Sequence, residues 1–74
     1  MLSPIQCKMA RAALSWSVKD LARQAHIAAN TVVRFENEKH EANPSTVLVI
    51  KQAFEAAGVR FTDDGGIVPP KKSG

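Results

Sequence analysis

Signals that start helices recur at short intervals along this chain, and they limit how long any helix can be. Ser3, Pro4 and Gln6 supply an N-cap hydroxyl, a proline suited to the first helical position and an amide that can bond back to the cap. Ser17 and Asp20 repeat the capping pattern. The chain therefore has room only for short helices, and its 74 residues allow one small domain.

The spacing of the apolar residues predicts four helices. They cover about residues 3–14, 18–25, 28–36 and 45–57, and Gly58 ends the fourth. Within these helices the residues expected to face the core recur at spacings of three and four; they are Cys7, Ala10, Leu14, Val18, Leu21, Ala22, Ala25, Val32, Phe35, Val47, Ile50, Phe54 and Ala57.

The C-terminal end of the chain combines a strand pattern with a biased tail. Residues 59–62 alternate between apolar and polar, and the Asp-Asp-Gly-Gly that follows is typical of a turn. Residues 63–74, with their Gly-Gly, Pro-Pro and Lys-Lys pairs, are expected to form a flexible tail. The expected fold is thus all-α, with four to five helices over residues 1–62 and a short C-terminal strand as an option.

Basic residues concentrate in the first half of the chain. The net charge is +3, but residues 1–35 alone carry a net of +4 and residues 36–66 a net of −3. The overall charge is too small by itself to indicate a polyanionic partner, so the position of the basic residues matters more than their number.

The residue types needed for metal, cofactor or covalent chemistry are scarce. Cys7 has no second thiol, and His26 and His40 have no partner at ligand spacing. No nucleophile and base pair, Gly-rich phosphate loop or carboxylate dyad occurs, so neither an enzyme, a cofactor nor a small-molecule ligand is expected. The single thiol fits a cytoplasmic protein, and the lack of a signal peptide or long apolar run argues against a membrane partner.

Two short helices separated by about three residues, then a polar loop and a further helix, have the spacing of a helix-turn-helix. The residues resemble the Cro/cI-type (XRE) helix-turn-helix family: Leu21-Ala22 in the second helix, Thr31-Val32 in the third and Glu36-Asn37 at its end match the family pattern. The match covers Ile5 to about Val59. The resemblance implies a lambda-repressor-like domain whose helix 28–36 enters the major groove of DNA.

The resemblance also implies which side chains read DNA bases. It points to Ala29, Asn30 and Arg34, and Val33 lies on the same outward face. Asn can pair with adenine and Arg with guanine through two hydrogen bonds each, and an alanine methyl can contact thymine. The alternative is that Asn30 and Arg34 only solvate a surface helix.

Three further implications concern phosphates, an ion pair and the core. The residues expected to face phosphates are Ser17, Lys19, Thr31, Asn37, Lys39 and His40. In the alternative, these residues are ordinary helix caps and solvated charges. Arg11 and Glu36 correspond to a structural ion pair of the family that ties the first helix to the third. Trp16 stands at an apolar position of the family and is expected in the core.

Three residues depart from the family pattern. Val18 replaces a glutamine that commonly reaches phosphate, which predicts a weaker phosphate grip. His26 and Glu38 replace glycines, so each is expected to adopt a left-handed conformation at a cost of about 1 kcal/mol, or the turns to differ. Glu38 and Glu41 also bring negative charge near the expected phosphate positions.

Helix 45–57 has more apolar residues than the core needs, which predicts a homodimer. The expected interface consists of Leu48, Val49, Ala53, Ala56, Val59 and Phe61. Residues 59–61 would pair with their symmetry mate as an antiparallel edge strand. In the alternative, Leu48 and Val49 cover the first helix of the same chain.

The sequence therefore predicts a sequence-specific DNA-binding transcriptional regulator that binds an inverted-repeat operator in double-stranded DNA as a homodimer. The alternative is a helix-turn-helix fold whose DNA face has decayed and which binds another protein, as an antitoxin or antiactivator does. Salt dependence separates the two, because DNA binding releases counterions and an apolar protein interface does not.

Overall fold

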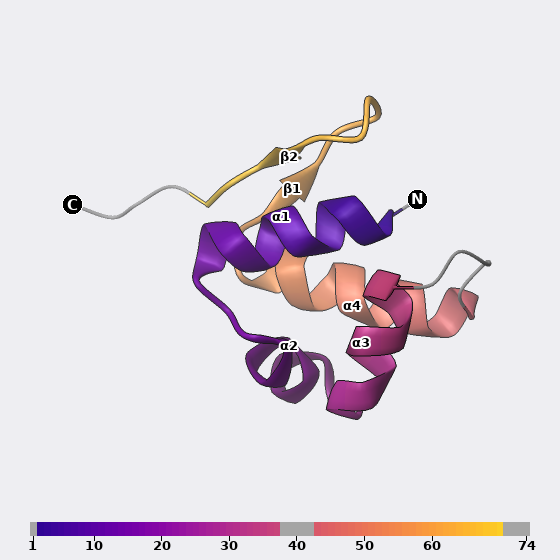
Figure 1. The fold of residues 1–74 in the computed structure, drawn as a ribbon. Coiled ribbons are helices and arrows are strands. Elements are labelled where there is room, and N and C mark those ends of the chain that lie inside the picture. Colours follow the sequence, from indigo (N-terminus) through magenta and orange to yellow (C-terminus); the bar gives the residue numbers. More distant parts are fainter. Residues whose placement is uncertain (1, 38–42, 71–74) are drawn as a thin grey trace.

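The computed structural model describes residues 2–37 and 43–70. The helices are α1 (Pro4–Leu14), α2 (Val18–Ala25), α3 (Ala29–Asn37) and α4 (Pro44–Ala56), followed by strands β1 (Arg60–Phe61) and β2 (Ile67–Val68), as Figure 1 shows. Each of the four predicted helices is present, and its ends lie within one residue of the predicted ends. The chain is mostly helical, with one small sheet.

Side chains next to the helix ends explain why the helices start where they do. Ser3 accepts a hydrogen bond from the Gln6 backbone N–H while the Gln6 side chain accepts one from the Ser3 N–H, and Ser17 and Asp20 form the same reciprocal pair before α2. Asn43 caps α4 by accepting from the Ser45 N–H at 2.8 Å. The cap residues predicted from the sequence therefore form capping hydrogen bonds in the structure.

The turns after α1 and α2 both use left-handed residues that are not glycine. His26 has φ 59° and Ser15 has φ 56°. The left-handed conformation expected of His26 is confirmed, whereas that of Ser15 was not expected. After α4, Gly58 has φ 97°, and a Cβ there would lie 2.9 Å from the Cβ of Pro70, so this position needs glycine for two reasons.

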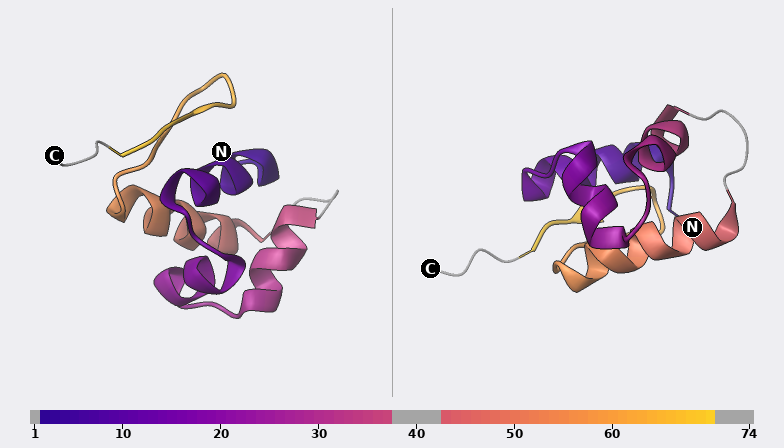
Figure 2. Two further views of the ribbon diagram at one scale, coloured as in Figure 1. Left: turned by 60° about the vertical axis from the view of Figure 1, so that its left-hand side comes forward. Right: turned by 90° about the horizontal axis from the view of Figure 1, so that it is seen from below.

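The core lies where the four helices meet and is made mainly of the predicted residues. Its largest fully buried side chains are Cys7, Leu21, Val32, Ile50, Phe54 and Val59. Trp16 is partly buried and stacks on Phe54, with ring centroids 5.7 Å apart, so its expected core role is confirmed. In Figure 1 and the left view of Figure 2, the α1–α4 layer separates α2 and α3 from the hairpin.

The strands form an antiparallel hairpin within the chain. Arg60 pairs with Val68 and Phe61 with Ile67. The Gln6 side chain donates from Nε2 to the backbone oxygens of Gly66 at 2.9 Å and Thr62 at 3.4 Å.

The hairpin corrects the expectation of a flexible tail and bears on the expected strand pairing. Residues 63–70, expected to start a flexible tail, instead form the turn and second strand, because Ile67 packs on the core and Gln6 satisfies the turn carbonyls. One edge of β1 is taken by β2, so pairing of β1 with a symmetry mate is not required to satisfy that edge. Residues 71–74 of the expected tail lie outside the described residues.

Within residues 2–37 and 43–70, no helix has the length and apolar character to cross a membrane. The same residues contain no group of three His, Cys, Asp or Glu side chains placed to hold a metal ion.

Candidate nucleic-acid interface

Helix α3 has one exposed face and one buried face. Asn30, Val33 and Arg34 are exposed, whereas Ala29 is partly buried against the core. Val32, Phe35 and Glu36 are buried on the opposite face. Three of the four predicted base-reading residues are thus accessible together, while Ala29 offers less of its surface.

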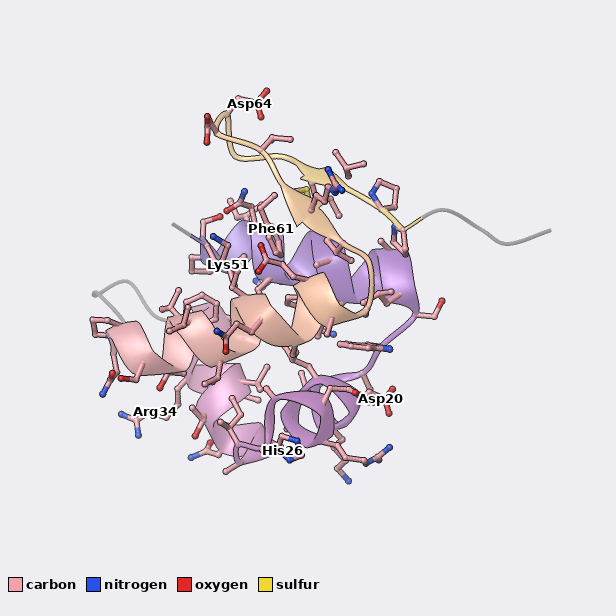
Figure 3. The ribbon with its side chains drawn as sticks, turned by 180° about the vertical axis from the view of Figure 1, so that it is seen from behind. Asp20, His26, Arg34, Lys51, Phe61 and Asp64 are labelled. Atoms are coloured by element: carbon pink, nitrogen blue, oxygen red, sulfur yellow. The ribbon has the colours of Figure 1, made fainter. Side chains whose placement is uncertain are left out.

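Exposed basic side chains occur on both α2 and α3. Lys19 and Arg23 on α2 and Arg34 on α3 are all exposed, and Asp20 is the partly buried acid among them. Arg23 and Asp20 approach to 3.7 Å at the surface, a distance at which an ion pair contributes little in water. Figure 3 shows Asp20, His26 and Arg34 on the α2–α3 side and Asp64 at the far end of the molecule.

The N-terminus of α2 is already occupied by its own cap. The Ser17 N–H donates to Asp20 at 2.9 Å, and hydrogen bonds from the Ser17 backbone and then from its side chain lower the pKa of Asp20. This carboxylate therefore stays ionised at neutral pH, and its negative charge opposes a nearby phosphate. The Ser17 hydroxyl accepts from the Asp20 N–H and is also engaged with the Asp20 carboxylate, so the cap uses the hydroxyl both as acceptor and as donor.

The other predicted phosphate contacts are unequal in accessibility. Asn37 is exposed at the end of α3, and Thr31 is partly buried. Lys39 and His40 lie outside the described residues, as do Glu38 and Glu41. Val18, where the family has glutamine, packs partly buried against the core.

The end of α3 is fixed to α1 by the Arg11 and Glu36 pair expected from the sequence. Arg11 Nε lies 2.6 Å from Glu36 Oε2 and Nη2 lies 2.7 Å from Oε1, so the contact is bidentate. The Glu36 side chain is 6% exposed and that of Arg11 is 20% exposed. Arg11 Nη1 also donates to the Trp16 carbonyl at 3.2 Å, which joins the loop before α2 to the same contact.

Cys7 contributes a donor that the sequence analysis did not assign. Its thiol donates to Glu36 Oε2 at 3.0 Å and the residue is fully buried. From the sequence, Cys7 was predicted only to be a small buried apolar residue. However, Cys7 stands four residues before Arg11, so the two side chains share one face of α1. That spacing was the signal that could have linked Cys7 to Glu36.

The predicted dimer residues do not form one exposed surface. Leu48 is 53% exposed and Ala56 is exposed, whereas Val49 and Ala53 are partly buried. The exposure of Leu48 goes against the alternative in which it covers α1. The assignment of Val59 was wrong: it is 1% exposed, because the turn after α4 directs it into the chain's own core.

Phe61 also packs within the chain. It is partly buried, and its ring meets that of Phe54 edge to face with centroids 5.9 Å apart. Nearby, Phe61 helps to line a pocket of about 230 Å³ between the start of α1, α4 and the hairpin turn. This pocket lies on the hairpin side of the molecule, away from α3.

Comparison with models of known protein families finds no match to this chain, and a search of curated proteins finds none either. Function is therefore inferred from the residues and the geometry of the site.

Proposed function

We propose that the chain is a sequence-specific DNA-binding transcriptional regulator that places α3 in the major groove. The observation that carries this proposal is the exposed face of α3. Asn30 and Arg34 lie one turn apart on that face, while the opposite face is packed into the core and held by Arg11. A rigid helix that presents an amide and a guanidinium together can make paired hydrogen bonds to adenine and guanine.

The arrangement of α2 and α3 supports the same proposal. The two helices pack together and are joined by residues 26–28, as a helix-turn-helix requires. The resemblance to the Cro/cI-type family gives α3 the role of recognition helix and the domain a lambda-repressor-like fold. Val33 would contact the methyl group of thymine, with Ala29 contributing less because it is partly buried.

Phosphate contacts would come from the rim of this surface. Lys19 is exposed at the start of α2, and the exposed Ser17 hydroxyl would donate to a phosphate oxygen in place of the Asp20 carboxylate. Lys39, His40, Thr31 and Asn37 are proposed to complete the set. Such contacts fix the position of the protein on the duplex without reading its sequence.

The test compares arginines on opposite sides of the molecule. Arg34→Ala and Arg60→Ala both remove one exposed positive charge, but Arg60 lies in the hairpin. In titrations with the DNA just upstream of the protein's own gene, Arg34→Ala should lose about 1–3 kcal/mol of specific binding and relax preference at one base pair. Asn30→Ala should behave like Arg34→Ala. Equal binding by Arg34→Ala and Arg60→Ala would contradict the proposal.

We also propose that the protein binds as a homodimer through the outer face of α4. One recognition helix reads few base pairs, and a two-fold pair about 34 Å apart reads an inverted repeat. Leu48 and Ala56 are exposed on this face, with Val49 and Ala53 beside them. Leu48→Glu should therefore yield a folded monomer in light scattering, and Ile5→Glu, which puts the same charge at an exposed apolar residue of α1, should leave the dimer intact. A wild-type monomer at high micromolar concentration would rule out this dimer.

One observation favours a second candidate, a protein-interaction module such as an antitoxin or antiactivator. The ionised Asp20 stands beside the proposed phosphate positions, where it weakens DNA binding. Salt separates the two candidates. Binding to DNA should weaken steeply between 50 and 200 mM salt, by about one decade or more for several phosphate contacts, whereas binding to a protein partner through Leu48 should change little.

A further inference from the structure

The carboxylate of Glu36 is held by donors that approach from two sides. Arg11 donates twice and remains 20% exposed, so water can reach its guanidinium. Cys7 approaches from the interior, where it is fully buried and its Sγ lies 3.0 Å from Oε2. Oε2 therefore accepts from Arg11 Nε and from the thiol, and only the thiol contact is closed to water.

The thiol keeps its proton in this position and so acts as a donor. Burial first, and then the hydrogen bond and negative charge of Glu36, raise the pKa of Cys7 far above its ordinary value. For Glu36, burial raises the pKa, but the hydrogen bonds from Arg11 and then Cys7, with the charge of Arg11, outweigh it and lower the pKa overall. A neutral thiol thus faces an ionised carboxylate.

We propose that Cys7 is a positioning residue for α3: its thiol fixes the Glu36 carboxylate from the buried side, and Glu36 in turn fixes the C-terminal end of α3 against α1. Glu36 is the next-to-last residue of α3, two residues after Arg34. Loss of the thiol donor would let the carboxylate turn toward water on the Arg11 side. The end of α3 would then be held less tightly.

The effect of Cys7 on Glu36 and on α3 rests on the contacts alone. The consequence for DNA recognition rests on the proposed function, because only then does the orientation of α3 set which bases Asn30 and Arg34 reach. The experiments therefore include readouts that need no DNA.

The decisive comparison is Cys7→Ser against Cys7→Ala. Serine and alanine are nearly equal in volume, so both leave a similar space in the core, but only serine keeps a donor toward Glu36. In carboxyl NMR titrations, Cys7→Ala should raise the pKa of Glu36, because the ionised form loses a hydrogen bond, and Cys7→Ser should keep it lowered. The described charged groups that act on Glu36, Arg11 and Lys8, are unchanged in both variants.

A buried control separates this effect from general loss of packing. Ile50→Val removes one methylene from a fully buried residue of α4 and leaves the hydrogen-bonding groups of Glu36, Cys7 and Arg11 unchanged. It should lower stability without moving the pKa of Glu36. Hydrogen exchange at the α3 amides should rise more in Cys7→Ala than in Cys7→Ser, and in Ile50→Val it should rise only in proportion to the stability lost.

Binding to DNA provides the third readout. Where all variants are fully folded, the ratio of operator to non-operator affinity should fall several-fold in Cys7→Ala and stay near wild type in Cys7→Ser. An unchanged pKa of Glu36 and unchanged α3 exchange in Cys7→Ala would overturn the positioning role. If those two measurements change as expected but wild-type protein binds no DNA specifically, the positioning role stands and the proposed function fails.

Discussion

Helix α1 holds two parts of the molecule by different chemistry. Gln6 holds the hairpin with a neutral amide that donates to two carbonyls, whereas Arg11 and Cys7 hold α3 through an ionised carboxylate. A neutral hydrogen bond contributes about 1 kcal/mol and does not titrate. A partly buried charge is costly to leave without its partner and depends on pH. Removing one partner should therefore lower the free energy of unfolding more at α3 than at the hairpin, and the contact that holds α3 should depend on pH.

The two attached parts also differ in charge. The surface around α2 and α3 presents Lys19, Arg23 and Arg34, and the hairpin turn presents Asp63 and Asp64. Arg34 on α3 and Asp64 in the hairpin turn thus lie at opposite ends of the molecule (Figure 3). A polyanion would be attracted to the α2–α3 side and repelled from the turn.

Removing the charge that holds α3 should have the largest effect. Glu36→Ala should lower the free energy of unfolding by about 3 kcal/mol, because Arg11 then stays partly buried without its partner. Arg11→Ala should cost a similar amount, and the double variant should cost much less than both losses together. Denaturant unfolding measures all three, and additive losses would contradict the shared contact.

Lowering the pH should reproduce part of that loss in the free energy of unfolding. The pKa of Glu36 is lowered in the folded state from its ordinary value of 4.5, so this group stabilises the fold above that value and the contribution is lost as pH falls through the folded pKa. Glu36→Gln should flatten this part of the stability curve, whereas Gln6→Leu should leave it unchanged. Thermal melts from pH 6 downward test the difference; an identical acid profile in Glu36→Gln would count against it.

Releasing the hairpin from Gln6 should lower the free energy of unfolding by a smaller amount and should affect mainly β1 and β2. Gln6→Ala should lower stability by about 2 kcal/mol, because two turn carbonyls and the cap of α1 lose their partner. Hydrogen exchange should rise in β1 and β2 and stay low in α3. Ser3→Ala is the matched control, since it removes the cap but leaves Gln6 able to hold the hairpin; it should cost about 1 kcal/mol. Equal exchange in the hairpin of both variants would show that Gln6 acts only as a cap.

The smallest effect should be a gain at the turn before α3. His26→Gly should raise stability by about 0.5–1 kcal/mol, because His26 is exposed and left-handed and glycine adopts that conformation without steric cost. Ser15→Gly, at the equivalent position after α1, should give a similar gain. Thermal melts measure both, and a loss of stability in His26→Gly would mean that its side chain contributes more than its backbone costs.

The helices could be predicted well because their signals are local. Caps at Ser3, Ser17 and Asn43 and apolar spacings of three and four act within one or two turns of the chain. The hairpin was only half predicted, since β2 is a two-residue strand whose position depends on Gln6, about 60 residues earlier. Local patterns contain no information on such a contact.

The candidate site also has some features that local patterns predict and others that depend on tertiary contacts. Helical periodicity alone assigns the two faces of α3, with Asn30 and Arg34 pointing outward and Val32 and Phe35 inward, so these faces could be read from the local pattern. By contrast, the burial of Val59 in the chain's own core, and the shared contact of Cys7 and Arg11 with the carboxylate of Glu36, follow from tertiary packing and not from a local pattern. These outcomes depend on which surfaces of distant segments meet, and the packing of the whole chain sets that choice.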